Sequence, residues 1–269
     1  MFSGPGRGNP VTMATILVTG SSDGIGRQTA STLAADGHRV VLHARNAERA
    51  EQARAAVPGA AAVVQGDLTS LAETRHLAEQ AAAAGPYDVV IHNAGVGGEQ
   101  SGPVRTVDGL ERIFQVNVLA PYVLTGLVPW PARLVYLTSG LEADGDPRLD
   151  DLQWENRGWD GMQAYSDSKL YDVMLAFAVA RRRPELLSNA VDPGWIRTRM
   201  GGPSATDELP AGAETQIWLA TSDEPAATVT GRYFKRRREL RANAAAYRED
   251  LQEQLLAKCA ELSGVKLPE

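Results

Sequence analysis

The sequence contains a single cysteine, Cys259, and it lacks any run of about 20 apolar residues. One cysteine cannot form an intrachain disulfide, which excludes the class of secreted, disulfide-stabilised scaffolds. Without a long apolar run the chain has no candidate transmembrane helix, so we expect no membrane insertion. Together these absences favour a cytoplasmic protein.

An excess of positive charge is absent as well. The 27 Lys and Arg residues are outnumbered by 33 Asp and Glu residues, and the net charge is −6. A protein of this charge does not present the general basic surface that binds nucleic acid. The histidines have no metal-ligand spacing and the lone cysteine has no partner, so we also expect no metal site. The histidines are His38, His43, His76 and His92.

The first twelve residues, Met1–Thr12, are rich in glycine and proline. We expect them to form a disordered leader, and Met13 is an alternative start. Residues 13–269 show neither an internal repeat nor a second domain, and they are numerous enough to bury one large core. We therefore expect a single dinucleotide-binding and catalytic domain over 13–269.

Short apolar, β-branched runs alternate with helical patterns along the chain. This alternation is typical of βαβ units, which build a parallel sheet with helices on both faces. We predict an α/β, doubly wound (Rossmann) fold with a seven-stranded parallel sheet in one domain. The expected strands are 14–19, 39–43, 61–65, 87–92, 133–138, 186–192 and 228–234, and the expected helices include 106–127 (in two pieces), 211–222 and 242–262.

A glycine-rich turn joins the first strand to the first helix. Gly20 permits a tight turn, Gly24 lets the backbone approach a pyrophosphate, and Gly26 permits close packing of helix on strand. The helix N-terminus adds amide donors and the positive end of the helix dipole. A plain glycine loop is the alternative. Under the dinucleotide interpretation the contacts come from Gly20, Ser22, Asp23, Gly24, Ile25 and Gly26.

The second strand ends at Ala44 and Arg45, where a dinucleotide-binding protein meets the adenosine ribose. An acidic residue there binds the 2′-hydroxyl of NAD, whereas an arginine accommodates the 2′-phosphate of NADP. The sequence offers no carboxylate, so we expect NADP rather than NAD. The alternative for Arg45 is an ordinary solvent-facing loop charge. Asp67, after the third strand, is placed to receive the adenine amino group.

Tyr165 and Lys169 stand four residues apart on an expected helix, so they share one face. A free phenol has a pKa of about 10, and a nearby ammonium group favours the phenolate form. A tyrosine activated in this way can exchange a proton with an alcohol or a carbonyl. A half-buried aromatic beside a solvated charge is the common alternative. Ser139 ends the fifth strand, at the sheet edge where open α/β proteins bind ligands.

These motifs together resemble the short-chain dehydrogenase/reductase family. In the order of that family, the matches are Thr19-Gly20-x-x-x-Gly24-x-Gly26, Asp67-Leu68, Asn93-Ala94-Gly95, Asn117, Ser139, Tyr165-x-x-x-Lys169 and Pro193-Gly194. The resemblance covers residues 14–198. It implies a nicotinamide cofactor held by the glycine turn and by Arg45, Asp67, Leu68, Asn93, Ala94, Gly95, Tyr165, Lys169, Pro193, Gly194, Ile196 and Thr198.

The resemblance also implies a role for each catalytic residue. Tyr165 is the general acid/base, and Ser139 hydrogen-bonds the substrate oxygen. Lys169 binds the nicotinamide ribose and favours the phenolate, while Asn117 anchors a water in a proton relay. Thr198 contacts the nicotinamide amide. The alternatives are that Ser139 merely caps a strand end and that Asn117 is a satisfied helix polar group.

A finer resemblance is to the retinol-dehydrogenase-like branch of the family. The long spacing from Ser139 to Tyr165 fits that branch, as do Asp150-Asp151-Leu152 and the segments 231–234 and 259–264. The membrane anchor common in that branch is missing, which weakens the case for a membrane retinoid substrate. The segment Leu127–Pro131 is short, which puts the helix-bundle dimer of the family in doubt.

The sequence thus predicts an NADP(H)-dependent oxidoreductase that interconverts a carbonyl and an alcohol on a small or medium-sized, partly apolar organic substrate. The alternative is a non-catalytic nucleotide-sensing or scaffold protein of the same fold. A homo-oligomer, dimer or tetramer, is an open expectation. The run Lys235–Arg238 is expected to be solvated after the last strand, with phosphate or partner binding as the lesser alternative. Five large side chains either line the substrate pocket or pack in the ordinary way: Trp154, Trp159, Met162, Trp195 and Met200.

Overall fold

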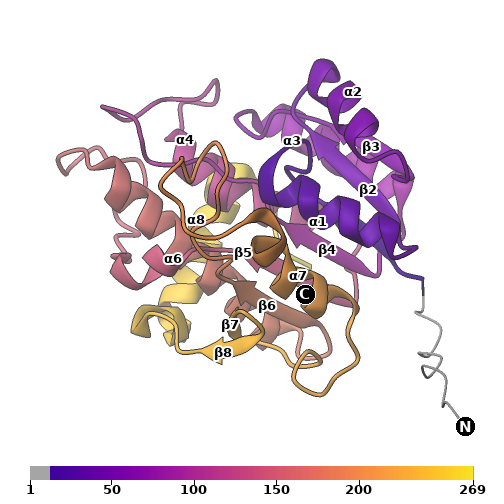
Figure 1. The fold of residues 1–269 in the computed structure, drawn as a ribbon. Helices are drawn as coiled ribbons and strands as arrows, with labels where there is room; N and C mark the ends of the chain where they lie inside the picture. Colours follow the sequence, from indigo (N-terminus) through magenta and orange to yellow (C-terminus); the bar gives the residue numbers. More distant parts are fainter. Residues whose placement is uncertain (1–12, 269) are drawn as a thin grey trace, which may run out of the picture.

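A single eight-stranded sheet forms the middle layer of the protein, with helices on both of its faces (Figure 1). The computed structural model describes residues 13–268, so the expected leader 1–12 lies outside the described residues. The strand order is β3-β2-β1-β4-β5-β6-β7-β8. The strands are β1 (Thr15–Val18), β2 (Arg39–Ala44), β3 (Ala62–Gln65), β4 (Val89–His92), β5 (Arg133–Leu137), β6 (Leu187–Val191), β7 (Tyr233–Lys235) and β8 (Arg238–Leu240).

The strands bury side chains on both faces, because each face is covered by helices. In β1, Leu17 points into one core, whereas Ile16 and Val18 point into the other. This two-residue alternation is the ordinary geometry of a strand, and apolar residues at every position are typical of a parallel sheet between two helical layers. The doubly wound α/β fold expected from the sequence is therefore confirmed.

The helices divide between the two faces. Helices α1 (Gly24–Ala35), α2 (Ala47–Ala56) and α7 (Leu209–Thr221) pack on one core. Helices α3 (Leu71–Ala84), α5 (Ala120–Leu127), α6 (Gly161–Arg182) and α8 (Glu249–Ser263) pack on the other. Short turns complete the set: α4 (Arg112–Phe114), the π-helical η1 (Gln115–Leu119), and the 3-10 helices η2 (Gly140–Asp144) and η3 (Ala244–Tyr247).

The end of the sheet differs from the sequence expectation of seven parallel strands. The last parallel strand begins at Tyr233 rather than at residue 228, and β8 pairs with β7 in the antiparallel direction. Arg236 and Arg237 form the turn between them, with φ angles of 49° and 56°. Positive φ at both central residues suits the twist of a two-residue hairpin. The basic run therefore forms a β-hairpin rather than a segment after the last strand, while Arg236, Arg237 and Arg238 are exposed to solvent as expected.

Two helix boundaries also differ. The helix expected over 106–127 begins only at Arg112, because residues 105–111 form a hydrogen-bonded loop closed by a bridge between Arg105 and Glu111. The helix expected from residue 242 begins at Glu249, because Asn243 is engaged elsewhere: its Nδ2 donates to the backbone oxygen of Gly145 at 3.0 Å. Within residues 13–268, no helix is long and apolar enough to cross a membrane.

The buried His92 at the end of β4 generates a prediction about stability. Its Nε2 lies 3.1 Å from Thr125 Oγ1, and the centre of its ring lies 4.7 Å from that of the tilted Tyr136 ring. Burial lowers the pKa of His92 to about 3. As pH falls below about 6.5, the imidazole of His92 therefore becomes protonated in the unfolded chain but stays neutral in the folded chain. The free energy of unfolding then falls by up to about 1.4 kcal/mol per pH unit.

We expect His92→Gln to remove this part of the pH dependence. Urea unfolding between roughly pH 7 and pH 5, a window that spans the titration of an unfolded histidine, should show a shallower loss of stability than in the wild type. The exposed His76→Gln variant is the matched control and should keep the wild-type slope. Equal slopes in all three proteins would contradict this account.

Candidate active site

Two adjoining cavities open at the carboxyl ends of the parallel strands. The first has a volume of about 420 Å³ and the second about 550 Å³. Tyr165 lines both, so its side chain stands at their junction. The residues that line both cavities are Ile25, Thr138, Tyr165, Pro193, Thr198 and Met200. This is the sheet edge at which open α/β proteins bind ligands.

The first cavity gathers most of the residues predicted to bind a dinucleotide. Those lining it are Gly20, Ser22, Asp23, Gly24, Ile25, Gly26, Arg45, Asp67, Leu68, Asn93, Ala94, Gly95, Tyr165, Lys169, Pro193 and Thr198. Gly194 and Ile196 line the second cavity instead, together with Ser139. Segments that are up to about 180 residues apart in the chain therefore converge on one site, as a parallel sheet requires.

The glycine turn is shaped by close backbone contacts. A Cβ atom at Gly26 would lie 2.3 Å from Asn93 Nδ2 and 2.4 Å from the backbone oxygen of Gly20. Gly20 itself has a φ of +63°, in the left-handed region that favours glycine. Asn93 Nδ2 donates to the backbone oxygens of Thr19 and Gly20 at 2.8 and 3.2 Å, which fixes the turn against the end of β4.

His43 holds the same turn from the other side, a role that the sequence did not reveal. The amide of Gly20 donates to His43 Nδ1 at 3.0 Å, and His43 Nε2 lies 2.9 Å from the backbone oxygen of Gly66. These partners require the neutral ring with its proton on Nε2. Burial lowers the pKa of His43, which keeps the ring neutral. Its position two residues before Arg45 was the available signal.

Arginines surround the outer end of the first cavity. Arg45 is exposed there, while Arg49 from α2 and Arg199 lie 3.5 and 3.6 Å from the carboxylate of Asp23. Burial works to raise the pKa of Asp23, but the amide of Gly24 and the arginines outweigh it and lower the pKa. Arg49 and Arg199 were missed from the sequence. Arg49 had a signal, since it stands four residues after Arg45, in the first turn of α2.

Arg112 adds an unsatisfied donor to this cavity. The Nε atom of Arg112 is buried and has no hydrogen-bond partner among residues 13–268, and the residue lines the first cavity. A buried donor without a partner is costly unless a ligand or water satisfies it. The glycine cradle, the arginines and this donor together fit an anionic nucleotide.

The helix that carries Tyr165 and Lys169 is anchored at its start by Asp160, whose carboxylate accepts from the amides of Met162 and Gln163. Lys169 Nζ lies 5.8 Å from the centre of the Tyr165 ring, so the ammonium group is near the phenol. Ser139 accepts a hydrogen bond from the amide of Leu141 at 3.3 Å. Ser139 thus caps the turn η2 that follows β5, and the proton of its hydroxyl stays available to a ligand.

A buried carboxylate, Asp172, pairs with Lys169. Lys169 Nζ donates to Asp172 Oδ2 at 2.7 Å and to the backbone oxygen of Leu137 at 3.0 Å. Burial raises the pKa of Asp172 to about 6, against the attraction of the lysine. Burial works to lower the pKa of Lys169, but Asp172 and Tyr165 outweigh it and raise the pKa. Asp172 was not predicted from the sequence, although it stands only three residues after Lys169.

Asn117 lies in the π-helical turn η1, buried behind the wall of the first cavity. Its Oδ1 accepts from the amide of Val96 at 2.8 Å, and its Nδ2 donates to the backbone oxygen of Val96 at 3.1 Å and to Ser168 Oγ at 2.9 Å. The side chain is satisfied by protein groups. A water relay at Asn117 stays a prediction, and it would have to use the backbone carbonyl.

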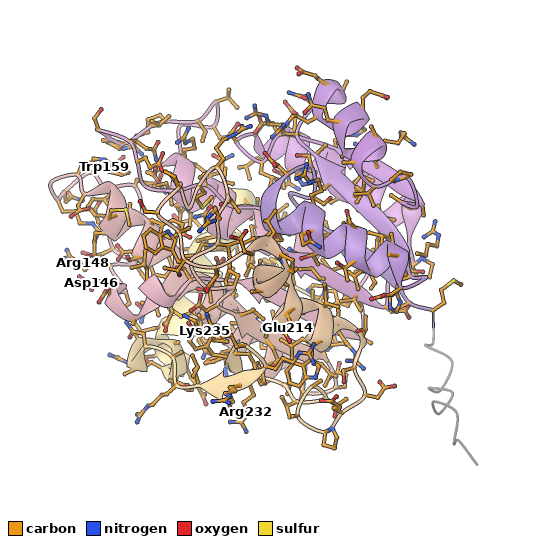
Figure 2. The ribbon with its side chains drawn as sticks, viewed as in Figure 1. Asp146, Arg148, Trp159, Glu214, Arg232 and Lys235 are labelled. Atoms are coloured by element: carbon orange, nitrogen blue, oxygen red, sulfur yellow. The ribbon has the colours of Figure 1, made fainter. Side chains whose placement is uncertain are left out.

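Only three of the five large side chains expected near the substrate line the second cavity. Met162, Trp195 and Met200 do so, and all three are exposed. Trp154 and Trp159 instead pack edge to face at 5.2 Å, and Figure 2 shows Trp159 at the periphery of the molecule. The ordinary packing alternative therefore holds for this pair.

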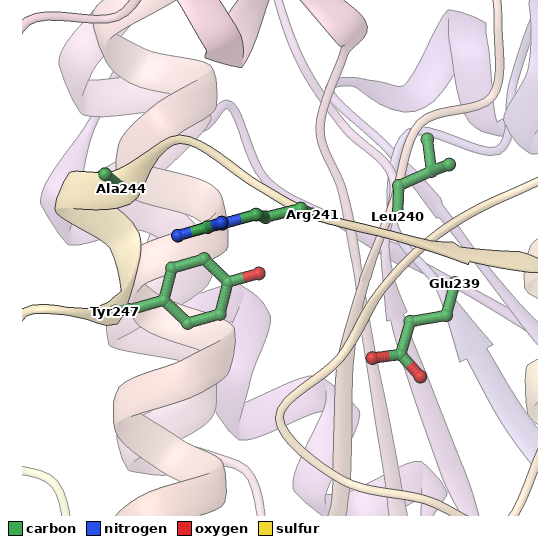
Figure 3. Close-up of a pocket in the computed structure, with 5 residues that line it drawn as sticks. All are labelled: Glu239, Leu240, Arg241, Ala244 and Tyr247. Atoms are coloured by element: carbon green, nitrogen blue, oxygen red, sulfur yellow. The ribbon is translucent and has the colours of Figure 1, made fainter.

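A separate hollow of about 510 Å³ lies beside β8 (Figure 3). It is lined by Glu239, Leu240, Arg241, Ala244 and Tyr247. None of the residues singled out in the sequence analysis as catalytic or cofactor-binding lies there. Among the residues that the structure describes, no group of three or more His, Cys, Asp or Glu side chains could hold a metal ion.

Comparisons with known proteins agree with this geometry. A sequence model described as short chain dehydrogenase matches residues 14–130. The chain is 42% identical over 261 residues to the short-chain dehydrogenase chyC of Penicillium rubens, covering 95% of this chain and 100% of the relative. It is 33% identical to human retinol dehydrogenase 14, covering 82% of this chain and 77% of that protein.

Solved structures are similar as well. A protein of uncharacterised function from Mycobacterium paratuberculosis superposes with a TM-score of 0.82 at 27% identity, covering 95% of both chains. A blue fluorescent protein from a metagenomic library, solved in complex with NADPH, superposes with a TM-score of 0.66 at 26% identity, covering 84% of this chain and 97% of that one.

The buried Lys169–Asp172 pair should appear as strong energetic coupling. Removing one partner leaves the other charge buried without compensation, which costs about 3–5 kcal/mol. We expect Lys169→Met and Asp172→Asn each to lose at least about 3 kcal/mol of unfolding free energy in urea at neutral pH.

The double variant Lys169→Met/Asp172→Asn is the decisive member of this cycle. It should be more stable than the sum of the single losses predicts, by about 2–3 kcal/mol. Losses that add to within about 0.5 kcal/mol would show that the two side chains do not depend on each other.

Proposed function

Since the chain belongs to the short-chain dehydrogenase/reductase family, in its retinol-dehydrogenase-like branch, we propose that it is an NADP(H)-dependent oxidoreductase. It interconverts a carbonyl and an alcohol on a small or medium-sized, partly apolar organic substrate. The observation that carries the proposal is the position of Tyr165, at the junction of the cavity lined by the glycine turn and the cavity lined by Ser139.

The first cavity is proposed to hold the cofactor. The pyrophosphate of the cofactor would bind at the glycine turn. The neighbours of Gly26 leave no room for a Cβ atom there. The bound nicotinamide supplies the hydride chemistry, and the protein supplies position and a proton. Arg45 and Arg49, with no carboxylate at the end of β2, support NADP over NAD. The similar structure in complex with NADPH also supports this choice.

Ser139 and Tyr165 are proposed to act on the reacting oxygen. The hydroxyl oxygen of Ser139 accepts a hydrogen bond from the amide of Leu141, and this leaves its O–H as a donor. The O–H is proposed to donate to the substrate oxygen and to orient it. In the reducing direction Tyr165 then gives its hydroxyl proton to that oxygen, and in the oxidising direction its phenolate removes a proton from the alcohol.

Lys169 is proposed to serve the tyrosine and the cofactor together. An ammonium group has three donors, and two of them bind Asp172 and the backbone oxygen of Leu137. The third has no partner among residues 13–268 and is proposed to bind a ribose hydroxyl. The ammonium group of Lys169 lies near the Tyr165 ring, and the buried carboxylate of Asp172 partly neutralises its charge.

The competing proposal is a nucleotide-sensing or scaffold protein without turnover. A protein of that kind does not need a complete catalytic set, yet Ser139, Tyr165 and Lys169 line the two cavities and Asn117 lies next to Gly95 of the first cavity. This completeness favours catalysis. The expectations of a cytoplasmic protein and of a homo-oligomer stay predictions.

Tyr165→Phe tests the proposed mechanism. The substitution removes only the hydroxyl, so we expect turnover to fall by about 10²-fold or more, as for loss of a general acid/base. NADPH binding, measured by calorimetry, should change by less than about threefold, because the ring still fills its place. Retained turnover would overturn the role of Tyr165.

Arg45→Ala tests the cofactor preference. Loss of a charge-assisted hydrogen bond to a 2′-phosphate costs about 1.5–3 kcal/mol, so the Kd for NADPH should rise by about tenfold or more. The Kd for NADH should change little. Arg54→Ala, an exposed change on the nearby helix α2, is the matched control. Equal weakening of both cofactors by Arg45→Ala would refute a 2′-phosphate contact.

A further inference from the structure

A lysine that the proposed mechanism does not use faces the second cavity. Lys235, the last residue of β7, is the only lysine or arginine among the described residues that line this cavity. Ser139 and Tyr165 line the same space. Lys235 was expected from the sequence to lie in a solvated run, and its place at this cavity was not predicted.

A buried carboxylate holds Lys235 in position. Lys235 Nζ lies 2.7 Å from Asp192 Oδ2, and Asp192 Oδ1 accepts from the amide of Gly194 at 2.8 Å. The Asp192 side chain is 3% exposed and that of Lys235 is 38% exposed. The carboxylate is therefore engaged on both oxygens, whereas the ammonium group keeps two donors without a protein partner among residues 13–268.

The ammonium group lies close to the reacting end of the cavity. A Cβ atom added to Gly140, the residue after Ser139, would lie 4.0 Å from Lys235 Nζ and 3.1 Å from Asp192 Oδ2. Gly140 thus leaves open the space between the serine and the lysine. The hairpin turn that follows Lys235 is itself tied down, since the amide of Arg237 donates to Thr215 Oγ1 at 3.2 Å.

The charge balance selects the kind of group that Lys235 can bind. The ion pair with Asp192 is neutral overall, so a carboxylate on the substrate would meet the buried anion as well as the cation. A neutral acceptor, such as a hydroxyl, ketone or amide oxygen, meets two free donors without that repulsion. Met162, Trp195 and Met200 line the rest of the cavity with exposed apolar surface, which suits an aryl or alkyl body.

Resting on the proposed function, we infer that Lys235 is a specificity-determining residue that donates a hydrogen bond to a second, uncharged oxygen of the substrate. The preferred substrates are then partly apolar ketones or aldehydes that carry a neutral oxygen near the reacting carbonyl. Asp192 is the positioning residue for Lys235.

Three aryl ketones of similar size test this inference with NADPH as reductant. Propiophenone carries one oxygen, phenylpropanedione adds a neutral oxygen, and phenylglyoxylate adds a carboxylate. The main variant is Lys235→Met/Asp192→Asn, because it removes the donor without leaving a buried charge unpaired, and the amide oxygen that replaces the carboxylate can still accept from the amide of Gly194. Lys258→Met, an exposed lysine on α8, is the matched control.

We expect the double variant to lower kcat/KM for phenylpropanedione by about tenfold or more, the effect of losing a hydrogen bond from a charged donor. Its kcat/KM for propiophenone should stay within about threefold of the wild type. The wild type should also use phenylpropanedione better than phenylglyoxylate, and Lys258→Met should match the wild type on all three compounds.

Equal effects on propiophenone and phenylpropanedione, or no effect on either, would overturn the inference. A wild-type preference for phenylglyoxylate that the variant abolishes would replace it with an anion site. A wild type that oxidises NADPH with propiophenone but not with phenylpropanedione would leave the proposed function standing and refute the inference. A folded wild type that turns over none of these compounds, nor any simple aldehyde, would refute both.

Discussion

The ammonium group of Lys169 is held inside the protein, and the arrangement of the site depends on how it is held. Asp172 and the backbone oxygen of Leu137 take two of its donors, and Thr138 Oγ1 donates to the backbone oxygen of Lys169 at 2.6 Å. Side chain and backbone of one residue thus join α6 to the end of β5. This junction fixes where Tyr165 stands, one helical turn earlier.

Charge neutralisation recurs across the site. Lys169 is paired with Asp172, Lys235 with Asp192, and Arg49 with Asp23. In the first two pairs the carboxylate is almost fully buried, and a buried charge is tolerated only when it is paired and hydrogen-bonded. In the second cavity, pairing with Asp192 leaves Lys235 as a fixed donor without net positive charge, which suits neutral carbonyl compounds better than anions.

The sequence predicted well wherever the signal is local. The alternation of strands and helices, the glycine turn and the Tyr165–Lys169 spacing all depend on neighbours within a few residues, and each fixes an element or a face. The order along the chain then brought these motifs to one edge, because parallel strands end on the same side of a sheet.

Contacts between distant segments, and local contacts without a periodic pattern, were harder to predict from the sequence. Lys235 and Asp192 are far apart in the sequence, and nothing local shows that β7 lies beside β6. The β7–β8 hairpin was missed because its turn is made of two arginines rather than of glycine or asparagine. The pairing of Trp154 with Trp159 likewise depends on loop geometry that has no periodic pattern.

Oxidation of NADPH by the wild-type protein, followed at the absorbance band of the reduced nicotinamide with a panel of aldehydes and ketones, tests the central claim most directly. The account predicts a loss of absorbance that scales with protein concentration for at least one partly apolar carbonyl compound. No turnover of any compound, while calorimetry shows that NADPH still binds, would contradict it and support a protein that senses the nucleotide without reacting.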